Sequence, residues 1–130
     1  MKYLLDTSVW LWSLTASDRI RREGRELLAR GTEELYLSAA SSWEIGIKVA
    51  LGKLTLPEPV ASYVPKRMSA QAIRPLPITH GHALAVVGLP QYHNDPFDRL
   101  LIAQAQAERM TILTADRAFR QYAVELIWCG

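Results

Sequence analysis

The sequence predicts an α/β protein with three layers, in which a mostly parallel sheet lies between helices on both faces. Short apolar segments typical of strands alternate with longer segments in which apolar residues recur at helical spacing. Alternating strands and helices form parallel sheets that are covered on both faces. The chain has 130 residues, of which 49% are hydrophobic and 22% charged, and no long linker divides it. We therefore expect a single domain over residues 1–130.

Two predicted strands and four predicted helices occupy the first half of the chain. The first strand, residues 2–5, ends at Asp6, and Thr7 and Ser8 are suitable caps for the helix that follows. Asp18 begins a second helix, which ends at Gly31. The other elements are a strand over 35–37, a helix over 39–50 that stops at Gly52, and a helix from Pro57 or Pro59 to about residue 70, which Pro65 should bend or divide.

The second half of the chain is predicted to continue the alternation. Two prolines break an extended piece over 73–78, and Thr79 can cap the short helix that follows. A polar loop over 91–95 leads to a helix that Pro96 opens and that runs through residue 108. The last elements are a strand over 111–114, a short helix over 116–122 and a strand over 124–128.

Composition and charge exclude several classes of protein. A single cysteine, Cys129, rules out an internal disulfide and suits a reducing cytoplasm, and we interpret it as an incidental thiol on the tail. No apolar run approaches the roughly 18 residues that span a bilayer, and the N-terminus does not resemble a signal peptide. We therefore expect a cytoplasmic protein without a membrane partner. The net charge of +2 permits a nucleic-acid partner without requiring one.

Two acidic residues lie at or just after the ends of predicted strands. Asp6 ends the first strand, and Asp116 comes two residues after the strand over 111–114. In open α/β sheets, ligands bind beyond the carboxyl ends of the strands, so both positions suit a functional site. Aspartate is also a good helix cap, and either residue could serve a helix that begins beside it. The residues alone leave both interpretations open.

Two further acids lie near predicted helix starts. Ser41-x-x-Glu44 has the pattern of a capping box, but Ser38 is an equally good cap and would leave Glu44 near the same edge of the sheet. In Asp95-Pro96-Phe97-Asp98, the proline suits the first helical position, which makes Asp95 the natural cap. Asp98 is then the stronger candidate for function.

Four carboxylates in one cleft would repel each other, and such a cluster persists most easily around a hard divalent cation. Mg²⁺ and Mn²⁺ prefer oxygen ligands, and a bound ion can lower the pKa of an attacking water and neutralise charge on a phosphodiester. His80-x-His82 lacks a third ligand at metal spacing, so a zinc site is not expected. No glycine-rich phosphate loop and no Gly-x-Ser-x-Gly motif occurs.

Several other residues are candidates for contacts with a substrate or a partner. Lys48, Arg99 and Arg117 could contact phosphates, although a solvated charge or an ion pair explains each equally well. His93 precedes the acid pair and could also touch a substrate. Trp43 is expected in the core. Trp10 and Trp12 cannot share one helix face, so one of them could be an exposed anchor for a partner.

Four stretches of the chain occur in an order and spacing that match a known family. They are residues 4–8 (Leu-Leu-Asp-Thr-Ser), 42–45 (Ser-Trp-Glu-Ile), 93–105 (His-Asn-Asp-Pro-Phe-Asp-Arg-Leu-Leu-Ile-Ala-Gln-Ala) and 112–116 (Ile-Leu-Thr-Ala-Asp), the third being the most specific. Over nearly the whole chain they resemble the PIN domain family, and specifically the VapC-type toxins of bacterial toxin–antitoxin systems.

The resemblance implies a PIN-like fold and a ribonuclease that uses Mg²⁺ or Mn²⁺. It maps the family's catalytic and metal-binding acids onto Asp6, Glu44, Asp98 and Asp116, with no departure at any of the four. By the same resemblance, the supporting residues are Thr7, Ser8, Asp95 and Thr114. It also implies a VapB-like antitoxin as partner, a homodimer within a toxin–antitoxin complex, and contact with DNA only through the antitoxin.

Three other functions compete with this interpretation. A signalling receiver domain would need a phospho-acceptor aspartate after a central strand and a lysine after a late one, whereas Ser38 and Trp128 occupy these places. A PIN-domain nuclease that processes RNA without being a toxin would more often carry an appended RNA-binding module. A catalytically silent binding module would have no need of four retained acids.

Overall fold

A computed structural model describes all residues, 1–130, and shows five parallel strands in one sheet. The strand order is β3-β2-β1-β4-β5. The strands are β1 (Lys2–Leu5), β2 (Glu34–Ser38), β3 (Arg74–Leu76), β4 (Thr111–Thr114) and β5 (Leu126–Trp128). Because all pairings are parallel, the carboxyl ends of the strands lie at one edge of the sheet.

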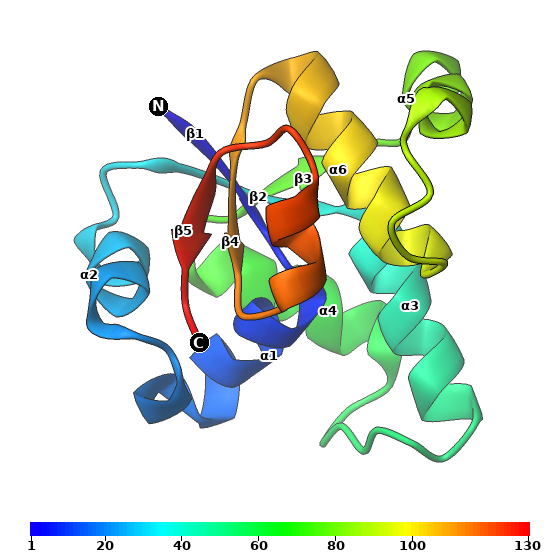
Figure 1. The fold of residues 1–130 in the computed structure, drawn as a ribbon. Helices are drawn as coiled ribbons and strands as arrows, with labels where there is room; N and C mark the ends of the chain where they lie inside the picture. Colours follow the sequence, from blue (N-terminus) through cyan, green and yellow to red (C-terminus); the bar gives the residue numbers. More distant parts are fainter.

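Six α-helices flank the sheet, and the predicted three-layer α/β/α fold is confirmed (Figure 1). The helices are α1 (Thr7–Thr15), α2 (Arg22–Arg30), α3 (Ala39–Ala50), α4 (Val60–Ala70), α5 (His80–Ala85) and α6 (Pro96–Glu108). Three short 3₁₀ turns complete the chain, at Ser17–Arg19, Val86–Gly88 and Arg117–Gln121. No helix is long and apolar enough to span a membrane.

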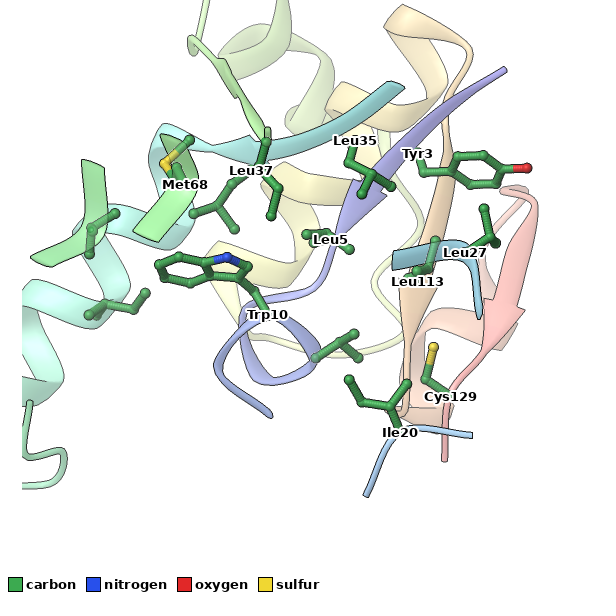
Figure 2. Packing of buried hydrophobic residues seen from close by; sticks show 14 residues of the cluster. Tyr3, Leu5, Trp10, Ile20, Leu27, Leu35, Leu37, Met68, Leu113 and Cys129 are labelled. Atoms are coloured by element: carbon green, nitrogen blue, oxygen red, sulfur yellow. The ribbon is translucent and has the colours of Figure 1, made fainter. Parts of the chain in front are cut away.

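The two faces of the sheet carry separate hydrophobic clusters, because successive side chains of a strand point to opposite faces. In β1, Tyr3 and Leu5 belong to the cluster that packs on α1, α2 and α4, whereas Leu4 belongs to the cluster under α6. Figure 2 shows the first cluster, which includes Trp10 of α1 and Met68 of α4. Every strand of the sheet centre is therefore buried on both sides, as its continuous apolar sequence predicted.

The order of the strands reverses beside β1. The chain runs from β1 outward to β2 and β3, and then returns to place β4 on the other side of β1. The carboxyl ends of β1 and β4 thus form the topological switch point, where α/β sheets leave a crevice for ligands. The amide of Asp6 donates to the carbonyl of Leu113 at 2.9 Å and joins the two strand ends.

Several element boundaries differ from the predictions. Asp18 lies in the 3₁₀ turn and not at a helix start, because α2 begins only at Arg22. Pro65 does not divide its helix: α4 runs unbroken from Val60 to Ala70. Residues 117–121 form a 3₁₀ turn rather than an α-helix, and the last strand begins at Leu126.

Two residues lie in environments opposite to those predicted. Trp43 is 63% exposed, because α3 buries the face that carries Ala40, Glu44 and Ile45. Cys129 is fully buried in the cluster that Figure 2 shows, and burial raises the pKa of its thiol to about 11. The interpretation of Cys129 as an incidental tail thiol is therefore wrong, since its side chain packs in the core.

Candidate active site

The acids that the sequence singled out meet in one pocket at the switch point. This pocket has a volume of about 610 Å³ and lies beyond the carboxyl ends of β1 and β4. Only two of its lining residues are hydrophobic. The full lining is Asp6, Ser8, Trp12, Glu44, Lys48, Asp95, Asp98, Ala115, Asp116 and Arg117.

Asp6 occupies the position before the first residue of α1, yet its side chain does not cap that helix. Its carboxylate instead accepts a hydrogen bond from the hydroxyl of Thr114 at 2.8 Å. Thr114 is the last residue of β4 and is fully buried, so it fixes Asp6 from the neighbouring strand. Of the two interpretations left open for Asp6, the structure does not show the helix cap, and Thr114 holds the carboxylate by a direct hydrogen bond.

Glu44 enters the pocket from the second turn of α3. Ser38 caps this helix by accepting from the amide of Ala40, so Ser41-x-x-Glu44 is not a capping box. The carboxylate of Glu44 accepts from the hydroxyl of Thr7 at 2.8 Å and lies 3.1 Å from the Lys48 ammonium. Thr7 therefore links α1 to α3, and Lys48 partly offsets the negative charge of the pocket.

Asp98 and Asp95 come from the start of α6. Asp95 caps the helix by accepting from the amides of Phe97 and Asp98, as the sequence predicted. Asp98, in the first turn, is 8% exposed and points its carboxylate into the pocket. The local sequence explains this arrangement, because a proline at the first helical position and an aspartate before it fix where the helix begins.

Asp116 enters from the turn after β4. Its carboxylate accepts from the amide of Ala118, so it caps the 3₁₀ turn and lines the pocket at once. Ser8 and Arg117 are exposed at the rim. Trp12 is half-buried there, with the Arg19 guanidinium 4.4 Å from its ring centre.

The electrostatics of the pocket follow from burial and from the mutual repulsion of the acids. Burial raises the pKa of Asp6 to about 6, against the Thr114 hydrogen bond, which lowers it. Burial is also the first cause that raises the pKa of Asp98 to about 8, followed by the charges of Asp6 and Asp95. A carboxyl group with so high a pKa retains much of its proton near neutral pH unless a cation displaces it.

The chemistry of the donors suits a hard divalent cation. All candidate ligands around the pocket are carboxylate or hydroxyl oxygens, the ligands that Mg²⁺ and Mn²⁺ favour, and no imidazole or thiol lines it. No three acidic, histidine or cysteine side chains already surround a common point. Asp6, Glu44 and Asp116 direct oxygens to protein donors instead. The oxygen donors therefore fit such an ion, and the carboxylate side chains would rotate toward a common point to bind it.

Arg99 does not line the pocket, which corrects its prediction as a phosphate contact. It is 5% exposed, and its guanidinium donates to the carbonyls of Pro90 and Val86 and to the hydroxyl of Tyr122. Position 99 follows Asp98 directly, so its side chain leaves α6 on another face. Lys48 and Arg117 do line the pocket.

Sequence reasoning missed a buried polar network behind the site. Gln104 accepts from the Ser38 hydroxyl at 2.6 Å, and His82 contacts both Gln104 and Glu108. This network ties α6 and α5 to the start of α3, which carries Glu44. A signal was present in the sequence, since a glutamine on the apolar face of a helix requires a buried partner.

Comparisons with known proteins agree with this fold. The family model of the PIN domain matches residues 3–125. Ribonuclease VapC16 of Mycobacterium tuberculosis is 46% identical over 67 residues, 52% of this chain and 47% of that protein, so the match covers about half of each. Ribonuclease VapC22 of the same organism is 28% identical over 92% of this chain and 90% of its own length.

A solved structure extends the likeness to the whole chain. The structure of VapBC2 from Rickettsia felis bound to a DNA fragment from their promoter superposes with a TM-score of 0.76 at 18% identity and covers 100% of both chains. At this identity the likeness concerns the fold, which is the three-layer arrangement described above.

Proposed function

Because this chain belongs to the PIN domain family, we propose that it is a Mg²⁺- or Mn²⁺-dependent endoribonuclease that acts as the toxin of a toxin–antitoxin pair. The observation that carries the proposal is the convergence of Asp6, Glu44, Asp98 and Asp116 on one pocket from four separate parts of the chain. The two similar proteins named ribonuclease VapC support the choice of RNA as substrate.

In this proposal the four acids hold one or two divalent cations. When bound, the metal supplies Lewis-acid chemistry, which lowers the pKa of an attacking water and offsets charge on the phosphodiester. Asp98 and Asp6 would have to lose their protons to hold the cation, since burial raises the pKa of both. Thr114 and Thr7 orient Asp6 and Glu44 through the hydrogen bonds described above.

We expect the basic residues of the pocket to contact the RNA backbone. Lys48 and Arg117 line the same pocket as the acids, one on α3 and the other after Asp116. Both would attract phosphates to a site that is otherwise negative. Lys48 forms an ion pair with Glu44, and we expect it to exchange this partner for a phosphate oxygen when substrate binds.

The proposed partner is a VapB-like antitoxin, and two copies of the chain would form a homodimer within the toxin–antitoxin complex. Support comes from the similar fold of VapBC2, which was solved with DNA from its promoter. Contact with DNA would come through the antitoxin. A small reading frame beside the gene for this chain would be the cheapest supporting observation.

An RNA-cleavage assay on the purified chain, freed of any antitoxin, tests the function. We expect cleavage in Mg²⁺ or Mn²⁺, none in EDTA, and none with Asp98→Asn in either metal. Asp18→Asn is the matched control, because it removes an exposed aspartate in the Ser17–Arg19 turn, outside the pocket. This control should cut like the wild type.

Two outcomes would contradict the proposal. Cleavage that persists in EDTA and in Asp98→Asn would mean that another site or a contaminant cuts the RNA. Absence of both cleavage and Mn²⁺ binding, measured by calorimetry on the wild type, would favour a catalytically silent module.

A further inference from the structure

Of the four acids, only Asp98 has a carboxylate that accepts no hydrogen bond from the protein. Thr114 donates to Asp6, Thr7 donates to Glu44, and the amide of Ala118 donates to Asp116. No donor lies within hydrogen-bond distance of the Asp98 carboxylate, although its side chain is only 12% exposed. A buried carboxylate that must become ionised is expected to have at least one donor nearby.

The nearest nitrogen to this carboxylate belongs to His93. Its Nε2 atom lies 3.6 Å from Oδ2 of Asp98. This nitrogen is itself buried without a hydrogen-bond partner. A buried nitrogen without a partner therefore faces the Asp98 carboxylate, which lines the pocket, across a gap slightly longer than a hydrogen bond.

The contacts on the other side of the imidazole decide which of its nitrogens carries the proton. Arg99 donates from Nη1 to the hydroxyl oxygen of Tyr122 at 3.1 Å. The same hydroxyl lies 2.7 Å from Nδ1 of His93. A phenol has one proton, and no other acceptor contacts this hydroxyl, so Tyr122 donates to Nδ1. A neutral imidazole whose Nδ1 accepts carries its proton on Nε2, which faces Asp98.

Contacts on the side away from Asp98 hold Tyr122 and Arg99 in place. Tyr122 is 5% exposed, and its ring packs edge-on against His93 with centroids 5.4 Å apart. Arg99 is fixed by carbonyl oxygens of the segment before the loop, including Pro90 at 2.7 Å. The imidazole therefore cannot turn its Nε2 atom away without breaking a buried hydrogen bond.

We propose that His93 is a positioning residue, which donates a hydrogen bond from Nε2 to Asp98 when Asp98 binds the divalent cation. This inference rests on the proposed function and assigns a role to a residue outside the four acids. Closing the gap requires Oδ2 to approach by about 0.5 Å, within the freedom of an aspartate side chain. The hydrogen bond would fix the orientation of the carboxylate and leave its other oxygen directed to the metal. Arg99 and Tyr122 then act through His93.

Calorimetry of Mn²⁺ binding to the metal-free protein tests the inference without requiring activity. His93→Ala should weaken Mn²⁺ binding about 10- to 100-fold, the usual effect of removing a partner of a metal ligand. His93→Gln should recover much of the affinity, because its amide nitrogen reaches about as far as Nε2 of the imidazole. His80→Ala is the matched control, since His80 is exposed on α5. We expect this variant to bind Mn²⁺ with the affinity of the wild type.

Nitrogen-15 spectra of the histidine rings provide a second measurement that a merely structural role would not affect. We expect His93 in the metal-free wild type to show the tautomer protonated on Nε2, and its Nε2 proton to shift when Mg²⁺ is added. Tyr122→Phe removes the hydroxyl that selects this tautomer, and the spectrum should become a mixture of the two.

Three outcomes would overturn the inference, and they differ from failure of the proposed function. A wild-type spectrum with the proton on Nδ1 would place no donor toward Asp98. Mn²⁺ affinity unchanged in His93→Ala, with cleavage intact, would mean that Asp98 needs no such support. A loss confined to RNA affinity would make His93 a substrate contact instead. If the wild type binds no metal, the proposed function fails and this inference fails with it.

Discussion

Trp10 of helix α1 and Trp43 of helix α3 show that the environment of a tryptophan decides how much it contributes to stability. Trp10 is fully buried, and its indole nitrogen donates to Gln71 at 2.9 Å. Trp43 is 63% exposed, and its ring meets Phe97 edge-on with centroids 5.2 Å apart. Both residues have helical apolar neighbours in sequence, but only one of them packs between the helix and the sheet.

We predict that Trp10→Ala lowers the free energy of unfolding by about 3–5 kcal/mol, because it opens a large cavity. Trp43→Ala should cost less than about 1.5 kcal/mol, since the variant loses mainly one aromatic pair at the surface. Urea titration followed by circular dichroism measures both. A loss for Trp43 as large as that for Trp10 would mean that the exposed face of α3 is covered in solution.

At the scale of elements, helix α2 packs at Gly24 against Cys129, the residue that follows strand β5. A Cβ atom at position 24 would lie 2.7 Å from the Cys129 sulfur and 3.1 Å from a methyl carbon of Ile20. Alanine has the higher helix propensity, but here the contact leaves no room for its side chain. The glycine therefore serves close packing between two elements.

We predict that Gly24→Ala destabilises the protein by about 1–3 kcal/mol, the usual cost of overpacking a core. The double variant Gly24→Ala, Cys129→Ala should recover part of this loss, because removal of the sulfur makes room for the new methyl group. A thermal-unfolding double-mutant cycle tests this coupling. Strictly additive effects would show that the sulfur is not the obstacle.

Helix α6 is joined to the loop before it through Arg99, whose guanidinium donates to three carbonyl groups of Val86, Leu89 and Pro90. We predict that Arg99→Met costs about 1–3 kcal/mol or more, because the variant leaves buried carbonyls without donors. Arg25→Met, at an exposed position of α2, is the matched control and should change stability by less than about 0.5 kcal/mol. Equal effects in denaturant titrations would contradict a structural role for Arg99.

At the scale of the whole molecule, the acidic pocket lowers stability when its carboxyl groups ionise, which is the state that would bind a metal. Asp98 and Asp6 bind protons more tightly in the folded chain than in the unfolded one, since their folded pKa values are about 8 and about 6. Between about pH 4 and pH 8 the folded state thus holds more protons, and the free energy of unfolding falls as pH rises. The stabilisation is complete below the ordinary aspartate pKa and is lost as pH passes about 8.

We predict that, in EDTA, the thermal midpoint of the wild type decreases from pH 5 to pH 8. Over the same range the free energy of unfolding should fall by an amount on the order of a few kcal/mol. Asp98→Asn should flatten this decrease and be more stable than the wild type at pH 8, because asparagine remains neutral. Mg²⁺ should raise the wild-type midpoint more at pH 8 than at pH 5, since its ligands must be ionised. A midpoint that rises with pH in EDTA would contradict the pKa shifts.

The sequence by itself determined the alternation of strands and helices and part of the helix boundaries. The caps expected at Thr7 or Ser8 and the helix start expected at Asp18 were wrong, because α1 already includes Thr7 and Ser8 and α2 begins only at Arg22. Apolar strands buried on both faces, the cap at Asp95 and the glycine stop at Gly31 are local signals, and the structure has them where they were predicted. The acids at the strand ends were also identifiable, because parallel strands bring their carboxyl ends to one edge.

Only the tertiary structure decided which face of each helix is buried and which polar groups pair. Trp43, Cys129 and Arg99 were misplaced because apolar or charged character does not say what packs opposite a side chain. The line of contacts from Arg99 through Tyr122 and His93 toward Asp98 joins residues up to 29 positions apart. Such contacts depend on how the layers pack against each other, and local sequence carries no record of that packing.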